Sequence, residues 1–73
     1  MGESLKYMRE AAGYSQSQLA AASGVSLRMI QHYEQGDKSI NKASVITVLK
    51  LAEALDCDVY DIIDPRTKDE MIP

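Results

Sequence analysis

Apolar residues recur along this chain mainly at helical spacings of three and four, and short polar breaks containing serine or glycine separate the runs. The first run begins at Ser4, a candidate cap, and ends at Gly13, which suits a left-handed exit from a helix. The expected inner face of this run consists of Leu5, Met8, Arg9 and Ala12. The pattern therefore predicts an amphipathic first helix.

Two further helices are predicted in the middle of the chain. Ser15 and Gln18 have the spacing of a capping box, in which each side chain bonds the backbone N–H of the other residue, and Gly24 ends the helix that follows. Ser26 is the expected cap of the next helix, which ends at Gly36. The inward positions of this third helix are Met29, Ile30 and Tyr33.

The remaining apolar positions predict one long helix and one short helix. Ile40 is expected to enter the core before the long helix, and either Asn41 or Ser44 to cap it. Asp58 and Asp61 have capping-box spacing at the start of the short helix. The long helix has the apolar stripe Val45, Val48, Leu49, Ala52 and Leu55, and the short one carries Val59, Ile62 and Ile63.

These five helices and the lack of a strand signal predict an all-α fold. The β-branched run 45–48 continues without a turn signal into a strongly helix-forming stretch. We expect residues 1–65 to form one domain, closed by Pro65, and residues 66–73 to form a polar tail. Met71 and Ile72 in this tail could dock on a partner.

Composition narrows the possible functions. The 73 residues include one cysteine, Cys57, and one histidine, His32, so neither an internal disulfide nor a metal-ligand cluster is expected. A core of this size leaves little room for a catalytic pocket, and no nucleophile and base stand at a recognisable spacing, so we expect no enzyme and no cofactor. No run approaches the roughly 20 apolar residues of a membrane span, and no leader pattern begins the chain, which predicts a cytoplasmic, reduced protein.

Charge divides the chain into two parts. Residues 1–50 hold six Lys and Arg against four Asp and Glu, a balance of +2. Residues 51–73 hold two against seven, a balance of −5, which gives the net charge of −3. The net acidity argues mildly against a nucleic-acid partner, but its concentration after Leu51 leaves a mildly basic front on which an anion could bind.

Residues 16–35, QSQLAAASGVSLRMIQHYEQ, carry the most specific pattern. Two helices that cross steeply through a short turn need a small residue at their contact, which Ala20 supplies. They also need a residue that tolerates positive φ in the turn, and Gly24 follows four positions later. The wedge between the two helices would be filled by Leu19, Val25, Ile30 and Tyr33. Together these positions predict a helix-turn-helix.

With LKYMREAAGYSQSQLA before it and LKLAEALDCDVYDII after it, the chain resembles the lambda-repressor and Cro/Xre family of helix-turn-helix domains over about residues 4–63. The resemblance implies a compact five-helix fold that binds operator DNA, usually as a dimer. One segment, DKSINKASVI, is a few residues longer than the common form and lacks the proline often found there.

In such motifs the second helix lies in the major groove with its N-terminal residues at base edges. Arg28 is the first candidate for base reading, because its guanidinium matches the two acceptors of guanine, and Leu27 could contact a thymine methyl. The family position of Gln16 implies a phosphate contact at the start of the first helix of the motif. The complete expected DNA surface is Gln16, Ser26, Leu27, Arg28, Gln31, His32, Gln35, Lys38 and Lys42.

The family pattern also implies a structural ion pair between Arg9 and Glu34.

Half-sites on one face of DNA lie about 34 Å apart, so one small domain reads only one of them, and a homodimer is expected. Candidate contacts between the copies are the end of the long helix, the tail, and Val59, Tyr60 and Ile63. The expected function is a DNA-binding regulator, typically a repressor. The alternative is an adaptor or antitoxin-type protein that uses the same fold to bind another protein.

Overall fold

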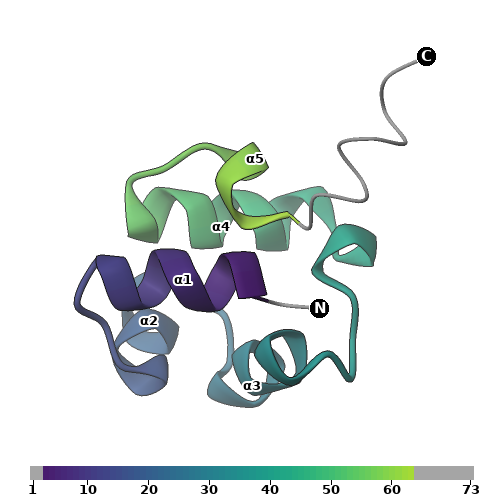
Figure 1. Cartoon of the computed structure of the whole chain (residues 1–73), viewed down its shortest axis with the longest axis horizontal. Helices are drawn as coiled ribbons and strands as arrows, with labels where there is room; N and C mark the ends of the chain where they lie inside the picture. Colours follow the sequence, from purple (N-terminus) through teal and green to yellow (C-terminus); the bar gives the residue numbers. More distant parts are fainter. Residues whose placement is uncertain (1–2, 64–73) are drawn as a thin grey trace.

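The structure, a computed structural model, describes residues 3–63. Within this range the chain is all-helical, which confirms the predicted fold class. Pro65 and the expected tail, with Met71 and Ile72, lie outside the described residues. The elements in order are α1 (Glu3–Ala11), α2 (Gln16–Ser23), α3 (Leu27–Gln35), the short 3₁₀ helix η1 (Ile40–Lys42), α4 (Val45–Leu55) and α5 (Val59–Ile62) (Figure 1).

Serine hydroxyls cap three of the helices, as predicted. Ser15, Ser26 and Ser44 each accept a hydrogen bond from the backbone N–H three residues later, at 3.1, 3.2 and 3.1 Å. The capping box of α2 is complete, because Gln18 Oε1 accepts from the Ser15 N–H at 2.8 Å. The expected cap of the first helix was wrong: α1 already begins at Glu3, so Ser4 lies inside the helix.

The helix ends combine predicted and unexpected features. Gly24 ends α2 with φ +78°, and its N–H donates to the Ala20 carbonyl at 3.0 Å. The end of α4 lacks a glycine. There Asp56 adopts the left-handed conformation, with φ +53°, and its N–H donates to the carbonyls of Ala52 and Glu53. No glycine signal in the sequence marked this turn.

Every element contributes one fully buried side chain to a common core. These side chains are Leu5, Leu19, Ile30, Ile40, Leu51 and Ile62. Ile40 enters the core from η1, as expected from the sequence, so the long connection between α3 and α4 is anchored at its centre. The fold therefore depends on all six elements together.

Two details of the predicted inner faces were wrong. Ala12 is exposed, because α1 ends at Ala11 and the chain turns away after it. In α4 the buried side chains are Val48, Leu51, Ala52 and Leu55, whereas Val45 and Leu49 are exposed. The helix is thus rotated relative to the predicted stripe, and Leu51 faces the core in place of Leu49.

The helices pack around α1 and α2. α1 contacts α3 and α5, α2 contacts α3 and α4, and α4 contacts α5. Figure 1 shows α3 on the opposite side of the molecule from α5. This arrangement leaves the outer surface of α3 uncovered by other described elements.

Candidate nucleic-acid interface

A three-residue turn fixes the crossing of α2 and α3. Gly24 supplies the positive φ, Val25 is buried between the helices, and Ser26 caps α3. A Cβ added at Gly24 would meet no atom within 4 Å, so backbone conformation alone favours glycine there. Leu19, Ile30 and Tyr33 are buried in the wedge and Ala20 packs against it. The predicted helix-turn-helix geometry is therefore present.

The outer surface of α3 carries a mixed polar and apolar set of side chains. Ile30 and Tyr33 anchor the inner side of the helix in the core. Ser26, Arg28 and Gln35 are exposed, Leu27 is 37% exposed, and Gln31 and His32 are half-buried. Arg28, His32 and Gln35 follow helical spacing, so they share one face of α3. This surface offers hydrogen-bond donors and acceptors on a rigid helix.

Two lysines extend the surface beyond the end of α3. Lys38 lies in the turn after α3 and Lys42 in η1, and both are exposed. They line a shallow hollow between α3 and the start of α4, together with Asp37 and Ser39. The longer connection noted in the sequence thus places two ammonium groups next to α3.

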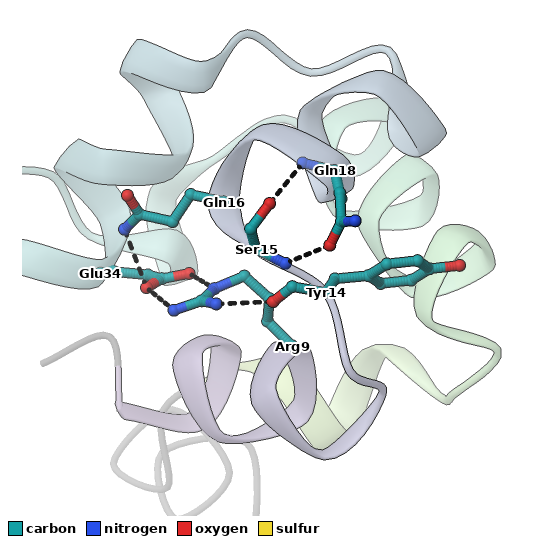
Figure 2. A network of polar contacts seen from close by, with 6 residues as sticks. All are labelled: Arg9, Tyr14, Ser15, Gln16, Gln18 and Glu34. Carbon is teal, nitrogen blue, oxygen red and sulfur yellow. Dashed lines mark hydrogen bonds and ion pairs between the residues drawn. The ribbon is translucent and has the colours of Figure 1, made fainter.

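A buried ion pair joins α1 to the last turn of α3 (Figure 2). Arg9 Nε donates to Glu34 Oε2 at 2.7 Å and Arg9 Nη2 to Glu34 Oε1 at 3.0 Å, which makes the contact bidentate. The third guanidinium nitrogen, Nη1, donates to the Tyr14 carbonyl at 2.7 Å. The hydrogen bonds to Glu34 raise the pKa of Arg9, so its charge is maintained.

Gln16 belongs to the same network. Its side-chain amide donates to Glu34 Oε1 at 3.1 Å, and Figure 2 shows it lying over the ion pair. The resemblance to the family implied only a phosphate contact for Gln16. In the structure one of its two N–H groups already has a partner, which holds the half-buried side chain at the head of α2. The first helix of the motif is thereby linked to the last turn of the second.

A second polar pair was not expected from the sequence. His32 Nδ1 lies 3.3 Å from Asp37 Oδ2, and both side chains are partly exposed. Asp37 follows the glycine that ends α3, and the Lys38 N–H donates to the His32 carbonyl at 3.3 Å. Nothing in the local pattern marked Asp37, because the contact depends on how the chain folds back after the helix.

Three other acidic residues lie away from α3. Asp56, Asp58 and Asp61 surround the turn between α4 and α5, on the side of the molecule opposite α3 (Figure 1). Burial first, and then these three carboxylates, raise the pKa of the Cys57 thiol. Within residues 3–63 no group of His, Cys, Asp and Glu side chains is arranged to hold a metal ion. Nor is any helix of that range long and apolar enough to cross a membrane.

Comparisons with known proteins agree with this geometry. A helix-turn-helix family pattern matches residues 5–62, from α1 to α5. A Pyrococcus horikoshii protein named as a helix-turn-helix type transcriptional regulatory protein is 35% identical over 71 residues, which are 93% of this chain and 22% of that protein. A similarly named protein of Methanocella arvoryzae is 43% identical over 58 residues, 80% of this chain and 17% of that protein. The chain thus spans about a fifth of the length of these relatives.

A solved structure is also similar. The restriction-modification controller protein C.AhdI from Aeromonas hydrophila superimposes with a TM-score of 0.73 and is 35% identical, over 82% of this chain and 86% of the other. The family match, this superposition and the α2–turn–α3 geometry agree with one another and with the resemblance found in the sequence. The chain belongs to the helix-turn-helix family, of the Cro and lambda-repressor type.

Proposed function

We propose that this protein is a sequence-specific DNA-binding regulator that inserts α3 into the major groove and represses transcription as a homodimer. The observation that carries the proposal is the surface of α3, where exposed Arg28 shares a face with His32 and Gln35 while Ile30 and Tyr33 hold the helix in the core. A recognition helix needs both properties, because base edges are read only by side chains whose backbone is held rigidly.

The proposed contacts divide into base reading and phosphate binding. Arg28 reads guanine through its two parallel donors, and Leu27, exposed beside it, packs on a thymine methyl. Gln31 and His32 reach the next bases along the groove. Phosphates are bound by the hydroxyl of Ser26 and by the side chains of Gln16, Gln35, Lys38 and Lys42.

A dimer is proposed because one copy presents one recognition helix. The radius of gyration is 11.2 Å, whereas half-sites on one face of DNA lie about 34 Å apart. The proposed contact is the α4–α5 apolar face, which we define as Val45, Ile46, Leu49 and Tyr60, exposed by 73, 66, 45 and 51%. An exposed apolar face of this kind is typical of a protein interface.

The α4–α5 apolar face combines a groove with exposed apolar side chains. Val45 and Tyr60 line an apolar groove between η1, α4 and α5, and Ile46 and Leu49 are exposed on α4. A twofold interface brings the same patch of both copies together, and a groove with exposed apolar side chains on the same face allows such a patch to pack against its own copy. A second copy of this chain is therefore the proposed occupant.

Repression follows from the proposed mode of binding, since a dimer seated on its operator excludes other proteins from that DNA. The similarity to a restriction-modification controller protein supports a regulatory role. We extend the proposal to residues 1–65 as the DNA-binding domain and 66–73 as a tail, acting in the cytoplasm, where the DNA of such a regulator is found.

The proposal is tested by DNA selection from a random pool, followed by affinity measurements on the selected site across a salt series. Binding is expected to weaken steeply as salt rises, because lysine and arginine displace counterions from phosphate. Arg28→Ala should lose about 1–3 kcal/mol of binding free energy on the selected site. Lys50→Ala, which removes an exposed cation from α4, serves as the control. If no sequence is enriched and no DNA is bound at low salt, the proposal is wrong.

A second candidate is a protein-binding adaptor or antitoxin that uses the same fold. The α4–α5 apolar face favours it, because this face could equally accept a different protein. The net charge of −3 also weakens general attraction to DNA. Failure of the DNA selection, together with a monomeric state in solution, would support this alternative.

A further inference from the structure

The contact between His32 and Asp37 places a carboxylate behind one nitrogen of the histidine ring. His32 Nδ1 is 3.3 Å from Asp37 Oδ2, and the two side chains are 31% and 58% exposed. Gly36, with φ +85°, reverses the chain after α3, and the Lys38 N–H bonds the His32 carbonyl at 3.3 Å. The backbone therefore returns residue 37 to the side of His32.

This contact determines the hydrogen-bonding character of the ring. A carboxylate only accepts hydrogen bonds, so the nitrogen that faces it must carry the proton. In a neutral imidazole the other nitrogen, Nε2, then has a free lone pair and acts as an acceptor. The same arrangement orients histidines that bind metals, where a carboxylate behind the ring selects the tautomer. Without Asp37 either nitrogen of His32 could carry the proton.

We infer that Asp37 is a positioning residue that determines which bases His32 reads. With Nδ1–H donated to Asp37, the neutral ring presents Nε2 as an acceptor. In the major groove the amino groups of adenine and cytosine are donors, whereas guanine N7 and O6 and thymine O4 are acceptors. His32 therefore selects adenine or cytosine on the strand that it contacts. The inference rests on the proposed function, since it requires α3 in the groove.

The pair complements Arg28, which lies one helical turn earlier on the same face of α3. A guanidinium has only donors and therefore reads acceptors, above all those of guanine. The His32–Asp37 pair adds an acceptor of fixed position next to two lysines, which can only donate. Two neighbouring positions of α3 would thus discriminate opposite classes of base.

The first test needs no DNA. His32 is the only histidine of the chain, so its ring nitrogens can be observed by ¹⁵N NMR without assignment ambiguity. At pH 8, Nδ1 of the unaltered protein should have the shift of a protonated nitrogen and Nε2 that of an unprotonated one. Asp37→Ala should mix or reverse these shifts, and Asp37→Glu should restore them. The same shifts in Asp37→Ala as in the parent protein would overturn the inference.

The second test is the DNA selection, repeated at pH 8 with the variants. His32→Ala should identify one position whose preference for adenine or cytosine depends on the ring. At that position Asp37→Ala should weaken the preference about 5-fold or more and leave the position read by Arg28 unchanged. Loss of a charge alone would instead change affinity uniformly over all positions. Glu53→Ala, which removes an exposed carboxylate from α4, controls for net charge.

The outcomes separate the inference from the proposed function. If the parent protein enriches no sequence, the proposed function fails and the base-reading inference fails with it. If it enriches one, but Asp37→Ala keeps the full preference at the His32-dependent position, only the inference fails. It also fails if His32→Ala changes no position at all.

Discussion

Arg9 and Glu34 are 25 residues apart in sequence, yet Arg9 Nε and Glu34 Oε2 lie 2.7 Å apart in the core-facing angle between α1 and α3. The side chains are only 11% and 4% exposed. Gln16, at the head of α2, bonds the same carboxylate at 3.1 Å. A single buried carboxylate therefore joins the two helices of the motif to the first helix of the domain.

Replacing Arg9 should lower the free energy of unfolding of the protein. In Arg9→Met the buried Glu34 carboxylate would lose its charged partner and keep only the bond from Gln16. Leaving a buried charge unpaired lowers the free energy of unfolding by about 3–5 kcal/mol. Urea unfolding measures the loss, with Lys6→Met, an exposed site on the same helix, as the control. Equal midpoints for the two variants would contradict the structural role.

The turn of the motif should tolerate asparagine better than alanine. Gly24 has φ +78° and open space around its Cα, so only the backbone penalises a side chain. Gly24→Ala should therefore lower the free energy of unfolding by about 1–2 kcal/mol, and Gly24→Asn by less, because asparagine enters the left-handed region more easily. Thermal unfolding of the two variants checks the order, and an alanine variant as stable as the parent would show that the turn adopts another conformation.

The end of α4 offers a stabilising substitution. Asp56 is the one described non-glycine residue with positive φ, at +53°. Asp56→Gly should raise the free energy of unfolding by about 0.5–1 kcal/mol, because glycine occupies this conformation without strain. Calorimetry should show a higher Tm. Glu53→Gly, inside the same helix, should lower it and serves as the opposite control.

A charge in the α4–α5 apolar face should separate the proposed dimer. Ile46 is 66% exposed, so Ile46→Glu should leave the monomer folded and weaken self-association at least about 10-fold through the buried, unpaired carboxylate. Tyr7→Glu, at a side chain 71% exposed on α1, is the matched control. Sedimentation equilibrium measures both. A parent protein that remains monomeric at high concentration would refute this interface.

Cys57 should react slowly with thiol reagents. Burial and the carboxylates of Asp61, Asp58 and Asp56 raise the pKa of its thiol, so at pH 8 a smaller fraction is thiolate than in the unfolded chain. Alkylation by iodoacetamide should therefore be several-fold slower in the native protein than in urea. Asp61→Asn should accelerate the native reaction, because it removes the carboxylate that contributes most to the raised pKa of the thiol. A native rate equal to the unfolded one would show that the site is open.

Local signals in the sequence predicted the motif and most helix boundaries. Ser15, Ser26 and Ser44 cap their helices because capping depends on residues three positions apart, which the chain itself brings together. Ser4 failed as a cap because the first helix already begins at Glu3. The left-handed Asp56 was missed, since aspartate adopts that conformation far less often than glycine.

The candidate site was predicted in outline but not in its connections. Arg28, Gln35, Lys38 and Lys42 lie on the exposed surface near α3, while their contacts with DNA stay predictions. The bonds of Gln16 to Glu34 and of His32 to Asp37 were not anticipated. Both depend on side chains meeting across a turn or between helices, and no periodic pattern encodes such meetings.

By itself, the sequence determined the helical periodicity, the serine caps and the glycine turns of this protein, because these follow from interactions within a few residues. Only the tertiary structure decided which side of α4 is buried, so that Leu51 enters the core and Leu49 remains outside. It likewise decided that Glu34 accepts from Arg9 and Gln16 together. The physical reason is that helix rotation and side-chain pairing depend on how all six elements fill one shared core.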